Sequence, residues 1–236
     1  MGAFHETVNN IIDNARRKNP KEEGDYTGKD GLLYCGKCHT PKESRVNLFG
    51  NGETVVPVPC KCRVEARKNE EEIAQKKKKA EQINRLKKRS LMDAKFSDCK
   101  FENLIIVPEN KKQIAIAKRY AEKFDELYRK NQGLLFYGDV GTGKTQIACC
   151  IGNVLMDKLN PVFCTSFVKI LQKANGFRNL EDKEIYLARM NQAKLLILDD
   201  LGAERGTDYA LEIVYNIIDT RYRSGKPMVV TTNLSI

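Results

Sequence analysis

Leu134–Thr145, with the sequence LLFYGDVGTGKT, decides the fold of this chain. It contains the pattern G-x4-G-K-[ST], in which Gly138 precedes Gly143, Lys144 and Thr145 by the required four residues. An apolar run typical of a buried strand comes before the pattern, and apolar residues recur at helical spacing from 146 to 159. A glycine-rich turn between strand and helix directs backbone N–H groups at one place, where they can hold polyphosphate. The sequence therefore predicts a nucleotide-binding loop made of Gly138, Asp139, Val140, Gly141, Thr142, Gly143, Lys144 and Thr145.

A second apolar run is predicted to complete the nucleotide site. Residues 194–198 read as a buried strand that runs directly into Asp199 and Asp200. Lys144 would reach the β- and γ-phosphates, while the hydroxyl of Thr145 would bind Mg²⁺. Asp199 would hold Mg²⁺ through water or through Thr145, and Asp200 would orient the attacking water. Buried strands often end in Asp, so the prediction depends on the pairing with the phosphate-binding loop.

Another predicted strand, 228–232, delivers Asn233 at its end. A polar side chain there, on a strand lying between the two nucleotide motifs, could sense the γ-phosphate or position water. The alternative is an asparagine that simply begins a turn. With the alternative left open, the predicted catalytic residues are Asp200, Asn233 and Lys144.

The rest of this half of the chain alternates between predicted helices and strands. A strand is expected over 162–165, and a helix over 113–129 precedes the phosphate-binding loop. Further helices are expected over 167–174 and 181–190. A long helix then carries an apolar stripe made of Leu211, Val214, Tyr215, Ile218 and Tyr222. Strands that alternate with helices predict an α/β fold built on a parallel sheet.

Size and composition restrict the remaining possibilities. The chain has 236 residues, enough for one or two domains with a sizeable core. No apolar run approaches the ~18 residues of a membrane span, and the N-terminus lacks the layout of a signal peptide. We therefore expect a cytoplasmic protein with no membrane partner. The net charge is +10.

Four cysteines in one short segment suggest a metal site. Cys35 and Cys38 form a C-x2-C pair, and Cys60 and Cys62 form a C-x-C pair after a loop. Four thiolates can enclose a tetrahedral Zn²⁺ completely, which makes such a site structural. His39 could replace one ligand, most plausibly Cys62, and a redox role for C-x-x-C is the rival interpretation. We expect zinc, bound by a module whose use is recognition.

The basic character of the chain is concentrated after this module. From Lys61 to Met92 there are 12 Lys and Arg residues against five Glu residues, with neither Gly nor Pro after residue 62. This composition favours an exposed helical spacer. The lysine run 76–79 and the cluster 87–89 could contact a phosphate backbone. The alternative is a solvated helix that only keeps the chain soluble.

The N-terminal 30 residues are predicted to form a helix and a flexible connector. An amphipathic helix is expected over 1–18, with Phe4, Val8, Ile11, Ile12 and Ala15 on one side. It could be a packing element or a face for a partner. The stretch 19–31 is rich in charge and glycine, which favours a connector.

Taken together, these motifs resemble a known family. GDVGTGKT, LLILDDLGAE, a helix ending in DTRY and a strand ending in TTNLS are similar to the DnaC/IstB group of AAA+ ATPases, which comprises bacterial and phage helicase loaders and transposition helpers. The resemblance covers roughly 96–236. It implies that Asp199 is the Mg²⁺-linked acid, that Asp200 is the water-activating acid and that Asn233 is the sensor. A cysteine-rich N-terminal module joined by a helix resembles the DnaI-like loaders in particular.

The resemblance implies an organisation in four parts. These are an N-terminal helix and connector (1–30), a four-cysteine zinc module (31–62), a basic helical linker (63–95) and an AAA+ ATPase domain (96–236). It further implies ATP, Mg²⁺ and Zn²⁺ as cofactors, a hexameric replicative helicase and single-stranded DNA as partners, ATP-dependent homo-oligomers, and the cytoplasm of a bacterium or phage-infected host. The implied function is helicase loading in DNA replication.

Two departures from the family pattern weaken the expected hydrolysis. Asp200 stands where many AAA+ proteins have Glu, and its shorter arm reaches less far. The chain stops at Ile236, so the family's fifth strand, arginine finger and lid are missing, and we expect a piece of a longer protein. The expected ATPase activity is therefore weak. Alternatives are an IstB-like transposition helper and a non-hydrolysing nucleotide-binding adaptor.

Overall fold

The computed structural model describes residues 10, 13–15, 17, 19–47, 52–176, 179–202 and 208–234. The chain forms two compact units, Met1–Lys78 and Lys79–Ile236. Of the apolar face predicted for the N-terminal helix, Phe4, Val8, Ile11 and Ile12 lie outside the described residues. None of the described helices combines the length and the apolar character that a membrane crossing requires.

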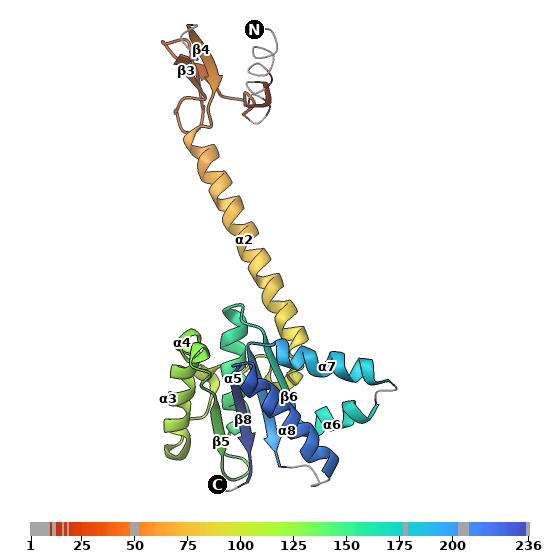
Figure 1. The fold of residues 1–236 in the computed structure, drawn as a ribbon. Coiled ribbons are helices and arrows are strands. Elements are labelled where there is room, and N and C mark those ends of the chain that lie inside the picture. Colours follow the sequence, from red (N-terminus) through yellow and green to blue (C-terminus); the bar gives the residue numbers. More distant parts are fainter. Residues whose placement is uncertain are drawn as a thin grey trace. The chain divides into compact units, whose positions relative to one another are not determined.

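The second unit is built on a four-stranded parallel sheet (Figure 1). Its strands are β5 (Leu134–Tyr137), β6 (Val162–Ser166), β7 (Leu195–Leu201) and β8 (Met228–Thr232). Their order is β5-β8-β7-β6, so β8 lies between the two strands that carry the nucleotide motifs. The predicted α/β fold and the predicted place of the Asn233 strand are confirmed.

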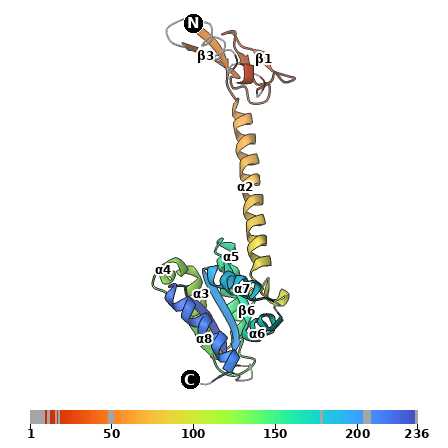
Figure 2. The same cartoon turned by 45° about the vertical axis from the view of Figure 1, so that its right-hand side comes forward.

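Helices cover both faces of this sheet (Figures 1 and 2). The core on one face contains residues of α3 (Pro108–Glu122), α4 (Phe124–Arg129) and α5 (Lys144–Asp157). The core on the other face contains residues of α6 (Phe167–Gly176), α7 (Leu180–Gln192) and α8 (Asp208–Arg223). Side chains of β7 alternate between the two cores, with Leu195 and Ile197 in the first and Leu196 and Leu198 in the second. A strand buried on both faces explains the unbroken apolar run.

Two helical predictions need correction. The helix expected over 113–129 is two helices, α3 and α4, which are separated at Lys123. On α8, the predicted stripe is largely the solvent face, where the side chains of Leu211, Tyr215 and Tyr222 are 57%, 67% and 76% exposed. The buried residues of α8 are Ala210, Ile213, Ile217 and Arg221. Val214 of the predicted stripe is partly buried and packs against the same core.

Arg221 is a charged residue that lies within this apolar core. It is fully buried and donates hydrogen bonds to five backbone carbonyls, with distances of 2.7 Å to Ala193 and 2.6 Å to Pro227. The other three acceptors are the carbonyls of Met190, Asn191 and Lys194. Four of the acceptors lie at the end of α7 and just beyond it, where the carbonyls of a helix lack intrahelical partners. Arg221 therefore ties the end of α7 to the turn before β8.

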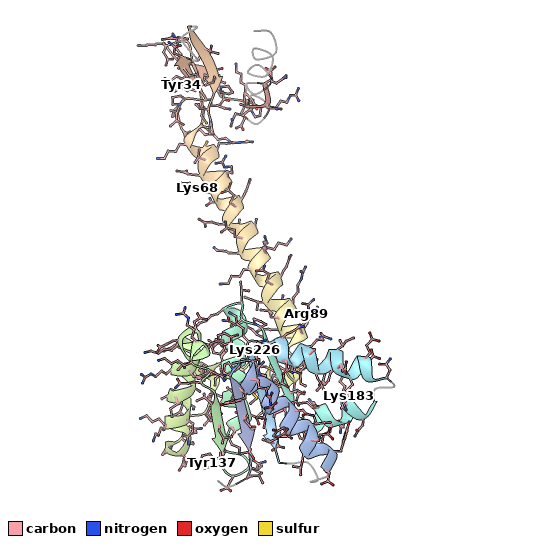
Figure 3. The ribbon with its side chains drawn as sticks, in the orientation of Figure 1. Tyr34, Lys68, Arg89, Tyr137, Lys183 and Lys226 are labelled. Atoms are coloured by element: carbon pink, nitrogen blue, oxygen red, sulfur yellow. The ribbon has the colours of Figure 1, made fainter. Side chains whose placement is uncertain are left out.

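The linker predicted over 63–95 is largely helical. Helix α2 (Lys61–Arg89) has no buried residue, and its residues from 65 to 82 are all exposed. Its side chains, Lys68 and Arg89 among them, project from the helix (Figure 3). After the helix, Ser90 is buried and its carbonyl accepts a hydrogen bond of 2.6 Å from the backbone N–H of Cys164 on β6. The chain then passes through the short helices η1 (Ala94–Phe96) and η2 (Phe101–Asn103).

The first unit contains two small antiparallel hairpins and the start of α2. One hairpin pairs β1 (Tyr26–Thr27) with β2 (Leu33–Tyr34), and the other pairs β3 (Glu43–Asn47) with β4 (Glu53–Pro57). The stretch 19–31, predicted to be a flexible connector, supplies β1, and its Asp25 accepts a hydrogen bond of 3.0 Å from the backbone N–H of Gly36. A Cβ on Gly36 would lie 2.2 Å from the carbonyl oxygen of Gly24. Gly36 is therefore required by close approach of this stretch, and not by a turn with positive φ.

Candidate nucleotide site and metal centre

The phosphate-binding loop wraps around the amino group of Lys144. Its Nζ donates hydrogen bonds of 2.7 Å to the carbonyls of Gly138 and Asp139. Gly141 and Gly143 have φ values of 88° and 84°, a conformation that L side chains rarely adopt, although nothing crowds either position. Gly143 directly precedes α5, so the N-terminus of that helix opens onto the loop.

The first acid lies against the loop as the sequence predicts for a magnesium site. The hydroxyl of Thr145 donates a hydrogen bond of 2.8 Å to Oδ1 of Asp199. The same oxygen accepts a hydrogen bond of 2.6 Å from the hydroxyl of Thr231 on β8. Hydroxyl and carboxylate oxygens are hard donors of the kind that Mg²⁺ prefers. The donor set at this point therefore fits the magnesium ion that accompanies ATP.

The second acid lies next to the predicted sensor residue. Nδ2 of Asn233 donates a hydrogen bond of 2.7 Å to Oδ1 of Asp200. Asp200 has a φ of 56°, and its backbone N–H donates a hydrogen bond of 2.9 Å to the hydroxyl of Thr231. The structure thus gathers Thr145, Asp199, Asp200 and Asn233 at the carboxyl ends of β7 and β8. Ligands of open α/β sheets bind at this edge.

A cavity of about 500 Å³ adjoins the loop. It lies among the first turns of α3, the edge strand β5 and the loop, with Gln113, Tyr137 and Thr142 in its lining. The cavities that hold small molecules in proteins have about this size. The loop can therefore hold phosphates while the cavity receives the remainder of a nucleotide.

The four predicted cysteine ligands come together in the first unit. The sulfurs of Cys35, Cys38, Cys60 and Cys62 all lie within 4.8 Å of one another, and Cys62 lies 3.6 Å from Cys35 and 3.3 Å from Cys60. Tetrahedral zinc with bonds of about 2.3 Å separates its sulfur ligands by about 3.8 Å. The donor set and its spacing therefore fit Zn²⁺. His39, the predicted substitute, is exposed and is not one of the residues gathered here.

The electrostatics of the cluster favour a bound cation. The hydroxyl of Thr40, 3.0 Å from the sulfur of Cys38, is the largest of several hydrogen-bonding influences that lower the pKa of that thiol to about 5. Hydrogen bonding with Cys60, together with the other neighbouring thiols, raises the pKa of Cys62 to about 12. Four thiolates packed this closely repel one another, and a bound dication would offset that electrostatic repulsion.

A buried ion pair holds the stretch 19–31 against the module that contains the four cysteines. Nζ of Lys42 lies 2.6 Å from Oδ2 of Asp25, and the two side chains are 6% and 2% exposed. Asp25 also accepts hydrogen bonds from the backbone N–H groups of Glu22 and Gly36. The hydrogen bond from Lys42 is the largest of the influences that lower the pKa of Asp25 to about 2. Asp25 is therefore ionised throughout the neutral range.

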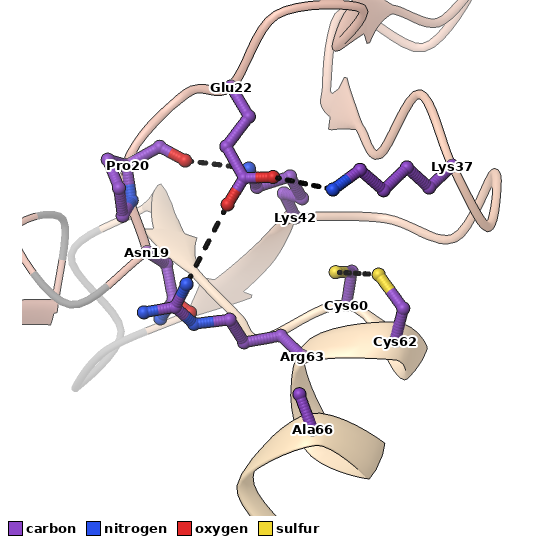
Figure 4. A pocket seen from close by; sticks show the side chains of 9 residues that line it. All are labelled: Asn19, Pro20, Glu22, Lys37, Lys42, Cys60, Cys62, Arg63 and Ala66. Atoms are coloured by element: carbon purple, nitrogen blue, oxygen red, sulfur yellow. Dashed lines mark hydrogen bonds and ion pairs between the residues drawn. The ribbon is translucent and has the colours of Figure 1, made fainter.

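A small cavity of about 210 Å³ lies beside the thiols of Cys60 and Cys62 (Figure 4). The carboxylate of Glu22 lies between two basic side chains there, 3.9 Å from Lys37 and 3.7 Å from Arg63. The lining thus carries charges of both signs. The positive side chains offset the negative charge that a zinc ion bound by four thiolates would carry.

The sequence from the second cysteine pair onward decides the family. The IstB-like ATP binding protein family matches residues 58–236, well over half of the chain. The chain belongs to this family. It is homologous to DnaC helicase loaders and has the AAA+ fold.

Individual relatives of this IstB-like chain include a replicative helicase loader. The chain is 28% identical to the replicative helicase loader DnaC of Buchnera aphidicola subsp. Baizongia pistaciae over 203 residues, which are 84% of this chain and 79% of the relative. This chain covers 64% to 65% of the length of other DnaC relatives. Among solved structures, the DnaC helicase loader is similar with a TM-score of 0.54 at 22% identity, over 61% of this chain and 81% of that one. DnaI is similar with a TM-score of 0.52 at 20% identity, over 61% and 77%.

Thr231 is the residue of this IstB-like site that the sequence analysis missed. It reads as one of several β-branched residues in a buried strand, with nothing to separate it from a packing residue. The sequence did contain a signal for it in the adjacent pair Asp199 and Asp200. Two acidic side chains at the end of a buried strand suggest that a neighbouring strand supplies a polar partner. Thr231 and Thr232 were the candidates for that partner.

Proposed function

We propose that this chain is an ATP-dependent loader of a replicative helicase in DNA replication. The observation that carries the proposal is the meeting of Thr145, Asp199, Asp200 and Asn233 beside a phosphate-binding loop. The homology to DnaC helicase loaders supports the task, since those relatives are named for it. The four-cysteine module supports a loader of the kind that carries an N-terminal recognition module.

In this proposal each residue of the nucleotide site has its own role. The loop amides and Lys144 bind the phosphates of ATP, and Thr145 and Asp199 hold Mg²⁺, which neutralises phosphate charge when bound. Asp200 orients and deprotonates the attacking water, and Asn233 fixes the carboxylate of Asp200 in place. Hydrolysis is slow because the arm of Asp200 is short, so ATP acts mainly as a conformational switch.

The proposal assigns the cysteine module to partner recognition. Zn²⁺ held by Cys35, Cys38, Cys60 and Cys62 has no open position for catalysis, which leaves a structural role. The module would bind the hexameric helicase. The ATPase domain would form ATP-dependent homo-oligomers along single-stranded DNA in the cytoplasm of a bacterium or a phage-infected host.

A capture experiment tests the assignment. The full chain is immobilised and offered purified hexameric replicative helicases from several bacteria, with ATP or ADP. We expect capture by the wild type and by Lys144→Ala, loss of capture with Cys35→Ser, and release on ATP addition with the wild type alone. Failure to capture any helicase would count against the proposal.

The exposed basic helix offers a second test, on DNA. The run from Lys76 to Lys79 lies on the fully exposed part of α2. Replacing these four lysines with Gln should weaken binding of single-stranded DNA and flatten its dependence on salt. The control replaces four exposed lysines of the ATPase unit, Lys100, Lys111, Lys112 and Lys123. Binding by the variant of 76–79 that equals binding by the wild type would assign the run to solubility.

A transposition helper is the second candidate, because the matching family takes its name from IstB-like proteins. Such a protein binds duplex DNA and a transposase. Capture of a transposase in place of the helicase would favour it. A third possibility, a non-hydrolysing adaptor, predicts equal ATP turnover by the wild type and by Lys144→Ala, with or without single-stranded DNA.

A further inference from the structure

The two acids of the nucleotide site lie on a bulge in β7. Leu198 pairs with Val230 and Leu201 pairs with Thr232, so the register shifts between these two pairs. Two residues of β7, Asp199 and Asp200, therefore lie opposite a single residue of β8. Such a bulge leaves an extra residue without its ladder partner and bends the strand.

Thr231 is the residue opposite this bulge. Its hydroxyl donates a hydrogen bond of 2.6 Å to Oδ1 of Asp199 and accepts one of 2.9 Å from the backbone N–H of Asp200. The side chain is 1% exposed, so water does not compete for these bonds. One hydroxyl therefore satisfies the N–H of Asp200 and orients the carboxylate of Asp199.

The bulge also sends the two acids in different directions. Asp199 reaches Thr145 on α5, whereas Asp200 reaches Asn233 beyond the end of β8. Asp200 adopts a φ of 56°, which costs energy for a residue other than glycine unless its surroundings hold it. The bond from its N–H to Thr231 is a contact that holds it.

We propose that Thr231 is a positioning residue for the nucleotide reaction. It fixes the carboxylate of Asp199 in the orientation that receives Mg²⁺, and it holds the bulge that separates the two acids. This inference rests on the proposed nucleotide site. The neighbouring Thr232 has a different task, since its hydroxyl donates to the carbonyl of Leu201.

The test measures binding of a fluorescent ATP analogue with and without Mg²⁺. Thr231→Val keeps the shape of the side chain and removes the hydroxyl. We expect the gain in affinity from Mg²⁺ to fall about 10-fold, equivalent to about 1.4 kcal/mol, while affinity without Mg²⁺ stays as in the wild type. Thr165→Val, at a buried threonine of β6, serves as the matched control.

A second pair of variants separates the hydroxyl from packing. Thr231→Ser and Thr231→Ala both lack the methyl group, and only the serine keeps the hydroxyl. We expect Ser to retain the Mg²⁺ effect and Ala to lose it. The inference would be overturned if Thr231→Val lost the same affinity for the ATP analogue with and without Mg²⁺. It would also be overturned if Thr231→Ser and Thr231→Ala showed the same Mg²⁺ effect. A wild type that binds no nucleotide at all would instead refute the proposed function, and the inference with it.

Discussion

Thr145 and Asp199 are joined by a hydrogen bond of 2.8 Å, although the first lies in the first turn of α5 and the second lies near the end of β7, 54 residues later. The bond places a hydroxyl and a carboxylate side by side at the mouth of the phosphate-binding loop. Both groups can bind one metal ion from the same side. The two halves of the nucleotide site therefore meet through these two side chains.

Removal of the Thr145 hydroxyl should uncouple Mg²⁺ from nucleotide binding. In Thr145→Val we expect the Mg²⁺-dependent part of the affinity to fall roughly 10-fold, because one hard oxygen donor is lost. The loop amides and Lys144 remain, so metal-free binding should persist. Titration of a fluorescent ATP analogue measures both, with Thr220→Val at an exposed threonine of α8 as the control.

Asp200→Asn should separate ATP binding from hydrolysis. Asparagine tolerates the positive φ at this position and keeps the side-chain shape, but it cannot accept a proton from water. We expect turnover to fall by about 100-fold with little change in nucleotide affinity. Asp200→Glu should also impair the site, because glutamate is less suited to this backbone conformation. Unchanged phosphate release by Asp200→Asn would remove Asp200 from the mechanism.

Zinc content tests the cysteine cluster directly. We expect about one zinc ion per chain by elemental analysis, and loss of the metal in Cys35→Ser. Because a small module gains much of its folding energy from the metal, a chelator should make this unit susceptible to protease. Cys99→Ser, outside the cluster, should keep its zinc. A folded wild type without metal would contradict the assignment.

Replacing Asp25 alone should destabilise the cysteine module more than replacing Asp25 and Lys42 together. Asp25→Asn leaves the buried ammonium of Lys42 without its carboxylate, so faster zinc release and proteolysis are expected. Asp25→Asn combined with Lys42→Met should recover part of the loss, and Glu23→Gln at an exposed site should have little effect. Since the pKa of Asp25 is lowered from 3.8 to about 2, its stabilising effect is complete above about pH 4 and is lost as the pH falls through 2.

Arg221 should contribute more to stability than any other charged residue of α8. Arg221→Met removes donors from five backbone carbonyls, and we expect a loss of roughly 3 kcal/mol in the free energy of unfolding. Arg223→Met, two residues later and exposed, should cost no more than about 0.5 kcal/mol. Urea denaturation compares the two variants, and similar midpoints would contradict the prediction.

The parts of this fold that follow from one local pattern could be predicted from the sequence. The phosphate-binding loop and the four-cysteine cluster have characteristic spacings, and the buried strand β7 has an unbroken apolar run. The sheet order and the family followed from combining them. The roles of the site residues and the domain boundaries stay predictions.

The parts that depend on tertiary context could not be predicted in this way. Helix α8 has two apolar stripes, and its core stripe contains Arg221, a residue that composition rules place outside. The bulge at Asp199 and Asp200 depends on a side chain of another strand. The stretch 19–31 has the composition of a connector, yet the pairing of Asp25 with Lys42 fixes it to the cysteine module.

The two edges of the sheet differ in their backbone hydrogen bonding. The backbone of Ser90 bonds to β6 at one edge, whereas β5 pairs only with β8 among the described strands. A polypeptide that extends this sheet would therefore join it beside β5, the strand that leads into the phosphate-binding loop. Any such added strand, from this chain or from another, would lie next to the phosphate-binding loop and so beside the bound nucleotide.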